Sequence, residues 1–137
     1  MSCVFCGIVE GRIPCHEVWE GDGILAFLDI RPIRPGHTLV IPKAHVPHFI
    51  DVEDKDYAGL MAASRRIAKA VMGVARPARV GLVIAGFDVP HTHVHVIPLQ
   101  DFGDIGLRAM PSSRPPAPPA QELAAMAEKL SEALARD

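Results

Sequence analysis

Three histidines at alternate positions constrain the fold of this chain more than any other feature. They are His91, His93 and His95, within the run PHTHVHVIPL at residues 90–99. Side chains of a β-strand alternate between its two faces, so residues two apart share a face. The spacing therefore predicts a strand that presents three imidazole rings on one side. Pro90 places the start of this strand, or a sheet edge, just before them.

Short apolar runs, separated by turn residues, predict five strands, the last of which is the histidine strand. The first two, at residues 18–20 and 24–28, are joined by a Gly-Asp-Gly turn and should form a hairpin. The remaining runs lie at residues 38–41, 80–85 and 94–98, the last of which carries His95. Helical spacing of apolar residues follows a possible cap at Asp51 and ends near Gly73 and Pro77. The order of these elements predicts an α+β fold with a mainly antiparallel sheet and one long helix.

The C-terminal part of the chain changes composition. Residues 110–119 are rich in proline and should form a stiff extended connector without regular structure. Residues 120–137 then carry a helical stripe formed by Leu123, Met126, Leu130 and Leu134. The expected organisation is a domain at 1–109, a connector at 110–119 and a C-terminal helix at 120–137. The stripe would pack on the domain core or on a second subunit, and composition does not decide between them.

Charge and hydropathy exclude several classes of partner. The formal net charge is −2, with no basic cluster that would mark a surface for nucleic acid or for an anionic membrane. No apolar run is long enough to cross a bilayer, and the N-terminus lacks a signal-peptide pattern. We therefore expect a cytoplasmic protein with reduced thiols that binds neither nucleic acid nor membranes.

The three cysteines suggest a metal site rather than disulfides. Cys3 and Cys6 form a C-x-x-C pair, which in a reducing compartment is a metal half-site or a redox pair. No strand can precede this pair, so metal is favoured over a thioredoxin-like motif. Structural zinc takes four ligands, and His45 and His91 could complete a Cys2His2 set. Cys15 has no partner at useful spacing and is expected to fill apolar space.

Two chemistries remain open for the histidines. Imidazole is a common zinc ligand, so the triad itself could bind a catalytic metal. Alternatively, a neutral imidazole nitrogen can attack phosphorus when an acceptor fixes the other ring nitrogen. A Cys2His2 site that includes His91 would leave His93 and His95 free for that second role.

With these motifs, the chain resembles the histidine triad (HIT) family of nucleotide-binding hydrolases and transferases. The run CVFCGIVEGRIPCHEVWEGDGILAFLDIRPIRPGHTLVIPKAH, from Cys3 to His45, is similar to the family's N-terminal half. HTHVHVIP fits its signature of three alternating histidines followed by apolar residues. The resemblance covers Cys3 to Leu99 and implies a HIT-like fold, with a five-stranded antiparallel sheet and a homodimer. Residues 1–109 would then be the HIT domain.

The resemblance also implies a mechanism and a set of site residues. His93 would attack the α-phosphate of a purine nucleotide or nucleoside phosphoramidate and form a nucleotidyl-histidine, which water then hydrolyses. His95 would bind the phosphate or share protons beside it, and His37 would support these residues from behind. Asp29 would hold the ribose hydroxyls, although it could equally be a turn residue after a strand. The base pocket would be lined by Val4, Phe5, Ile8, Phe27 and Ile30, residues that otherwise read as core. In zinc-bearing bacterial members, the structural zinc ligands match Cys3, Cys6, His45 and His91.

One segment departs from the family pattern. Most members carry an Asn and then Gly-Gln-Ser/Thr-Val before the triad, whereas residues 84–90 read IAGFDVP, with Phe87 and Asp88 at the amide and hydroxyl positions. An ionised Asp88 should weaken binding of a phosphate, a protonated Asp88 could donate to the leaving group, and a turn residue pointing away would do neither. Three hypotheses follow: a nucleotidyl hydrolase acting through His93, a nucleotide-binding module with little turnover, and a metallohydrolase with zinc on the triad.

Overall fold

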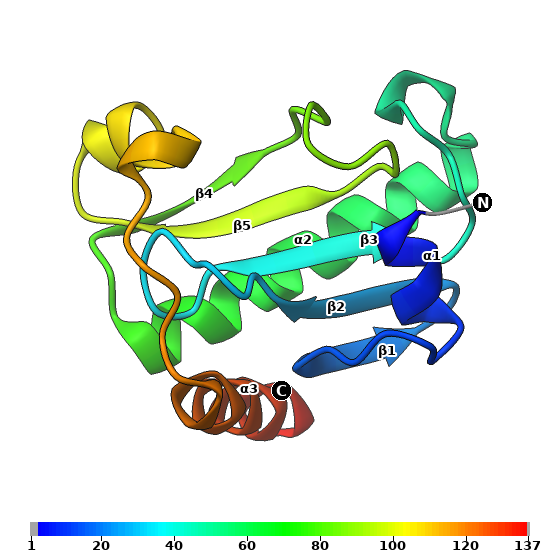
Figure 1. Ribbon diagram of the computed structural model, residues 1–137. Helices are drawn as coiled ribbons and strands as arrows, with labels where there is room; N and C mark the ends of the chain where they lie inside the picture. The colour runs from blue at the N-terminus through cyan, green and yellow to red at the C-terminus, as the bar shows by residue number, and fades with distance from the viewer. Residues whose placement is uncertain (1–2, 137) are drawn as a thin grey trace.

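A five-stranded antiparallel sheet forms the centre of the protein in a computed structural model, which describes residues 3–136 (Figure 1). The strand order is β1-β2-β3-β5-β4. The strands are β1 Glu17–Gly21, β2 Ile24–Leu28, β3 Thr38–Pro42, β4 Arg79–Val83 and β5 Val94–Leu99. The predicted α+β class and antiparallel sheet are confirmed. Residues 1–2 and 137, the outermost positions of the expected domain and C-terminal helix, lie outside the described residues.

The predicted hairpin joins β1 and β2 through a two-residue turn. Asp22 and Gly23 both have positive φ, at 50° and 77°, and Gly21 pairs with Ile24. Two such residues give the turn the twist that flanking strands need, and Asp-Gly is a preferred pair for it. The turn thereby fixes the register between β1 and β2.

Both faces of the sheet are covered, which explains why β2 reads as a continuous apolar run. Ile24, Ala26 and Leu28 belong to a core shared with the long helix α2, Asp54–Ala75, which crosses one face of the sheet (Figure 1). Leu25 and Phe27 point to the opposite face, where they pack with Phe5 of the short helix α1, Val4–Val9. The sequence pattern did not predict α1. This second face carries the candidate functional site.

The long helix differs at both ends from its prediction. Asp51 does not cap it, because Asp51 ends a separate 3-10 turn, η1 Phe49–Asp51, and α2 begins at Asp54 after Glu53. The helix also continues past Gly73, where no neighbouring atom lies near the position a Cβ would take. It ends when Arg76 adopts a left-handed conformation with φ 52°, just before Pro77.

The C-terminal helix α3, Ala120–Ala135, packs on the main core. Leu123, Leu130 and Leu134 are buried in the cluster that contains α2 and the sheet. The hydroxyl of Ser131 donates to the carbonyl oxygen of Val18 in β1. Within the single chain the partner of this apolar stripe is therefore the domain core, one of the two alternatives the sequence left open.

The segment between β5 and α3 is more structured than its composition predicts. It forms three short 3-10 turns, η2 Phe102–Asp104, η3 Leu107–Ala109 and η4 Pro111–Ser113, so the expectation of an irregular connector from residue 110 is wrong over η4. Beyond η4 the chain is extended and runs down to α3 (Figure 1). The guanidinium of Arg31 holds it by donating to the carbonyl oxygens of Arg114 and Pro115, at 3.1 and 3.2 Å.

Within residues 3–136, no helix is both long and apolar enough to cross a membrane.

Candidate active site and metal centre

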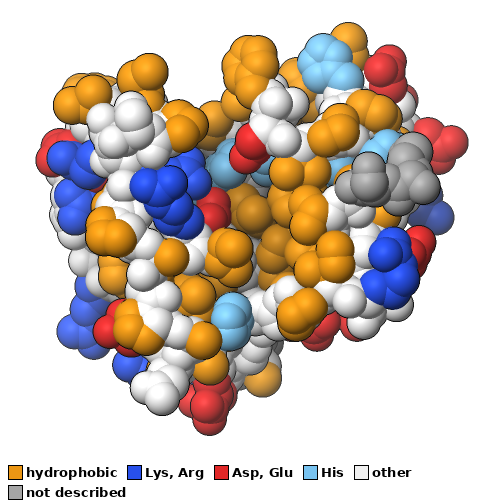
Figure 2. All heavy atoms as spheres, in the orientation of Figure 1, with side chains coloured by type: hydrophobic (Ala, Val, Ile, Leu, Met, Phe, Trp, Pro, Cys, Tyr) orange, Lys and Arg blue, Asp and Glu red, His pale blue; other side chains and the backbone are white. Residues whose placement is uncertain are grey.

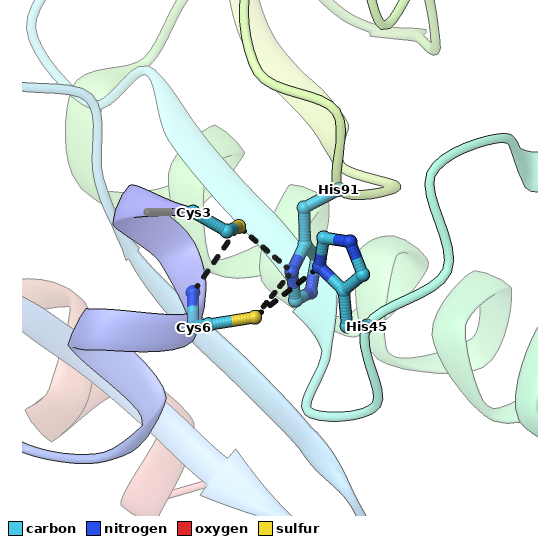
Figure 3. Close-up of side chains that lie close together, drawn as sticks. All are labelled: Cys3, Cys6, His45 and His91. Carbon is cyan, nitrogen blue, oxygen red and sulfur yellow. Dashed lines mark hydrogen bonds between the residues drawn. The ribbon is translucent and has the colours of Figure 1, made fainter. Parts of the chain in front are cut away.

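Four side chains from three distant parts of the sequence converge beside α1 (Figure 3). Cys3 precedes the helix and Cys6 lies within it, His45 follows β3, and His91 precedes β5. The distance from His91 Nδ1 is 3.5 Å to Cys3 Sγ and 3.6 Å to Cys6 Sγ, and Cys6 Sγ lies 3.2 Å from His45 Nδ1. These are the four residues that the sequence suggested as metal ligands.

The donor set fits tetrahedral zinc. With Zn–S near 2.3 Å and Zn–N near 2.0–2.1 Å, a tetrahedron separates sulfur and nitrogen by about 3.5 Å, close to the distances above. The other ring nitrogen of His91, Nε2, donates to the carbonyl oxygen of Pro42 at 2.7 Å. That bond leaves the Nδ1 lone pair facing the cysteines, as a metal-binding histidine requires. Burial lowers the pKa of His91 and so favours the neutral ring.

His93 lies beside this cluster with its two nitrogens in different environments. Its Nδ1 donates to the carbonyl oxygen of His91 at 2.8 Å, so the hydrogen of the neutral ring is on Nδ1. Its Nε2 is buried and has no hydrogen-bond partner among the described residues. The ring of Phe5 packs edge-on against it at 5.1 Å between centroids. In its neutral form the ring therefore carries a lone pair on Nε2, as a nucleophile requires.

The tautomer of His95 is set by a relay through His37. The backbone N–H of Ile33 donates to His37 Nδ1 at 3.1 Å, so the hydrogen of His37 is on Nε2. His37 Nε2 in turn donates to His95 Nδ1 at 3.0 Å. The hydrogen of His95 must then be on Nε2, where it is available to an anionic ligand. His37 thus lies beside His95 and contacts its Nδ1.

Burial keeps both members of this relay uncharged at neutral pH. The pKa of His95 falls to about 4, because burial and then the charge of His93 disfavour its protonated form. The pKa of His37 is lowered well below its ordinary value, chiefly by burial. A neutral His95 acts as a hydrogen-bond donor through Nε2 rather than as a cation.

Only His95 of the triad lies in a regular strand, because β5 begins at Val94. His91 and His93 precede it in an extended segment held by Thr92, whose backbone N–H and hydroxyl both donate to the carbonyl oxygen of Val46. The rings of His93 and His95 are neighbours, with centroids 4.9 Å apart. The predicted alternation thus brings these two rings together, while His91 turns to the cysteines.

A cavity of about 250 Å³ lies next to His93 and contains every residue expected to bind nucleotide. Its lining includes Val4, Phe5, Ile8, Phe27, Asp29, Ile30 and Asp88. Figure 2 shows a hollow on this face with hydrophobic side chains inside it and charged side chains at its margin. The apolar walls suit a planar aromatic group.

Asp29 stands at the polar end of this cavity. Its Oδ1 accepts from the backbone N–H of Arg31 at 2.9 Å, as a turn residue would, while its Oδ2 lies 3.6 Å from His37 Nε2. Burial raises its pKa, and the hydrogen bond from Arg31 opposes that shift. The structure therefore combines the two interpretations of Asp29, a turn residue whose second carboxylate oxygen faces the site.

Asp88 faces the triad rather than pointing away from it. Its Oδ1 lies 3.3 Å from His93 Nε2 and also accepts from the backbone N–H of Val89. Its neighbour Phe87 is 98% exposed. Asp88 also lines a second cavity of about 230 Å³, which extends past His95 along β4 and β5. The carboxylate thus sits at the boundary between two cavities.

Arg114 is a site residue that the sequence did not reveal. Its Nη1 lies 3.3 Å from Asp29 Oδ2, and it lines both cavities with Asp88. It belongs to the proline-rich connector, 85 positions from its carboxylate partner. No spacing rule marks such a pair, and only the cationic residue within an otherwise uncharged connector could have drawn attention to it.

Comparisons with known proteins match this architecture. A family model described as the HIT domain matches residues 10–102. Adenosine 5'-monophosphoramidase hnt1 of Schizosaccharomyces pombe is 36% identical over 96% of this chain and 97% of its own length. An uncharacterized HIT-like protein of Borreliella burgdorferi is 39% identical over 71% of this chain and 75% of its own. A zinc-bound histidine triad family protein of Mycobacterium smegmatis superposes with a TM-score of 0.80, at 33% identity, over 99% of this chain and 95% of that one.

Proposed function

The chain belongs to the HIT domain family, and from this premise we propose that it is a hydrolase of nucleoside 5'-phosphoramidates or related nucleotidyl compounds. One observation carries the proposal: His93 holds its hydrogen on Nδ1, and its unpaired Nε2 lies 3.3 Å from Asp88, a residue that lines both cavities. The related fission-yeast enzyme is named for the cleavage of such a phosphoramidate. A purine base would occupy the apolar cavity, with the ribose hydroxyls on Asp29.

The reaction proceeds by two displacements at the α-phosphorus. Nε2 of His93 forms a bond to phosphorus as the bond to the leaving nitrogen breaks, and the Nδ1 hydrogen bond to His91 stabilises the ring as it becomes positively charged. The Nε2–H of His95 binds a non-bridging phosphate oxygen. Water then attacks phosphorus, the P–Nε2 bond breaks, and the nucleoside monophosphate leaves.

The leaving nitrogen needs a proton as its bond to phosphorus breaks. Asp88 lies 3.3 Å from the attacking atom of His93 and at the entrance of the second cavity, where the leaving group departs. The negative charge of a bound phosphate favours the protonated carboxyl of Asp88, which can then supply this proton. The base that activates water in the second step is the resulting carboxylate.

We further propose that Cys3, Cys6, His45 and His91 hold a structural zinc ion. Support comes from the donor geometry and from the zinc-bound relative. Zinc bound there would fasten α1 to the segment that leads into β5. Because the carbonyl of His91 also accepts from His93 Nδ1, the same segment orients the nucleophile.

A second candidate function, a metallohydrolase, rests on the close approach of other donors. Atoms of Asp88, His93 and His95 lie within 4.8 Å of one another, as do atoms of Asp29, His37 and His95. A catalytic metal there would make His93 a ligand rather than a nucleophile. This function requires a metal that is lost with His93 and not with Cys3 or His91.

The homodimer that the resemblance implies is part of this proposal. In the single chain, β4 is an edge strand, and Leu82 on it is 40% exposed. Exposed apolar residues on a sheet edge favour pairing with another chain. Light scattering coupled to gel filtration would report the mass of the dimer.

The decisive experiment compares His93→Ala with the unmodified protein on a panel of adenosine 5'-phosphoramidates. The hydrolase proposal expects a loss of turnover of at least about 10³-fold in a variant that still folds and keeps its zinc. Turnover that survives the substitution would exclude His93 as the nucleophile. Nucleotide binding without turnover in the unmodified protein would instead identify a binding module.

A further inference from the structure

Two charged side chains, Asp88 and Arg114, are common to the linings of both cavities. Asp88 faces the free nitrogen of His93, and Arg114 lies on the side of Asp29. A substrate with its nucleoside in the first cavity and its leaving group in the second would pass between them. The phosphate of that substrate must therefore lie at the boundary these residues form.

The hydrogen bonds of Arg114 leave part of its guanidinium free for a ligand. Its Nη1 donates to Asp29 Oδ2 and to the carbonyl oxygen of Arg31, at 3.3 and 3.4 Å, and its Nη2 donates to the carbonyl oxygen of Ala109 at 3.3 Å. Its Nε is buried and has no hydrogen-bond partner within residues 3–136. Of the five N–H groups, the Nε–H and one on Nη2 thus remain. Two N–H groups of one guanidinium can bind two phosphate oxygens at once.

The negative charge of the site and of its ligand also favours a positively charged side chain nearby. Asp29 and Asp88 are acidic, His37 and His95 are held neutral, and a nucleotide brings at least one more negative charge. Arg114 is the one lysine or arginine among the described residues that line either cavity. The segment before the triad supplies Phe87 and Asp88, so it adds no positive charge.

We propose that Arg114 binds the phosphate of the substrate, so that the connector between β5 and α3 forms part of the active site. The inference rests on the proposed nucleotide site and adds a specific anion-binding group to it. Arg31 supports this role, because it holds the backbone of Arg114 and Pro115 against the loop after β2. Asp29 then links the two halves of the ligand, since it binds the ribose and orients the guanidinium.

The test separates phosphate binding from nucleoside binding. Isothermal titration of the zinc-loaded protein with AMP and with adenosine gives two affinities and their ratio. Loss of a charge-assisted pair of hydrogen bonds should weaken AMP binding roughly 10- to 100-fold in Arg114→Gln. The affinity for adenosine should change by less than about 3-fold in the same variant. Arg114→Lys should recover part of the loss. Arg12→Gln, which removes an exposed arginine paired with Glu10, should change neither affinity.

Each other outcome overturns the proposal. If the affinities for AMP and adenosine fall together in Arg114→Gln, the side chain only supports the fold or the position of Asp29. If neither changes, Arg114 does not touch the ligand. If the unmodified protein binds AMP no better than adenosine, the phosphate has no dedicated partner although the nucleoside site stands. If it binds neither, the proposed nucleotide site fails as well.

Discussion

Nε2 of His93 and Oδ1 of Asp88 lie 3.3 Å apart, and Asp88 lines two cavities. The hydrogen of the neutral ring is on Nδ1, so a lone pair and a carboxylate face each other unless a proton lies between them. A bound phosphate must take the place that Asp88 partly covers. Asp88 therefore competes with the phosphate in the ground state, yet stands where the leaving group needs an acid.

Asp88→Asn should separate these two effects. Removing the charge should tighten AMP binding by roughly 3- to 10-fold, a modest gain because the side chain is 67% exposed and water screens it. Hydrolysis of an alkylamine phosphoramidate should slow, since the amide supplies no acidic proton, while a phosphoramidate with a good leaving group should be much less affected. Calorimetry and steady-state kinetics measure both. Asp51→Asn, at a position exposed to solvent, is the matched control. Equal slowing on both substrates would exclude Asp88 as the acid.

Metal removal should destabilise the protein. The purified chain should contain one zinc per protomer, and Cys6→Ser or His91→Ala should abolish it. Because a structural metal contributes directly to folding, we expect the melting temperature to fall by about 10 °C. Cys15→Ser is the control, since Cys15 is partly buried but does not belong to the four-residue cluster. Elemental analysis and calorimetric scans test this, and zinc that persists in Cys6→Ser but is lost from His93→Ala would favour the metallohydrolase.

Most of the fold follows from local patterns that the sequence displays. The β1–β2 hairpin was predictable because Asp-Gly turns and apolar runs are read over a few residues. The ends of α2 were not, because tertiary packing rather than a side-chain cap decides where it begins, and an exposed Gly73 does not stop a helix whose other face is buried. The helix α1 is too short to show a period.

The candidate site was predictable in its members but not in its chemistry. The histidine spacing and the family resemblance named His93 and His95, yet their tautomers depend on the His91 carbonyl and on the relay from Ile33 through His37. Those partners are brought together only by the folded chain. Arg114 was missed for the same reason, because its relation to Asp29 crosses 85 positions.

The C-terminal helix should contribute to the stability of the domain. Leu130 is fully buried between α2 and the sheet, so Leu130→Ala should lower the free energy of unfolding by about 3 kcal/mol. Leu107→Ala, at a position 67% exposed, should change it by less than about 0.5 kcal/mol. Urea unfolding measures both variants. A small effect at Leu130 would mean that α3 folds as a separate unit, as the expected boundary at residue 119 allows.

Acid should destabilise the protein in part through His95. An exposed histidine in the unfolded chain has a pKa near 6.5, whereas burial and the neighbouring His93 lower that of folded His95 to about 4. The unfolded state thus binds the proton more tightly. The stability associated with a neutral His95 is complete above pH 6.5 and is lost as the pH falls to about 4. Over that window the loss amounts to about 3 kcal/mol.

Unfolding in urea at pH 7, 5.5 and 4.5 tests this relation by comparison with His95→Gln. Glutamine can still accept from His37 but does not titrate, so the variant should lose less stability than the unmodified protein between pH 7 and 4.5. Zinc release and the titration of groups distant from His95 act on both proteins and cancel in the difference. His48→Gln, at an exposed position, should keep the slope of the unmodified protein. Parallel slopes for His95→Gln and the unmodified protein would mean that His95 is not held neutral by burial, and that its Nε2 hydrogen is not the fixed donor the phosphate requires.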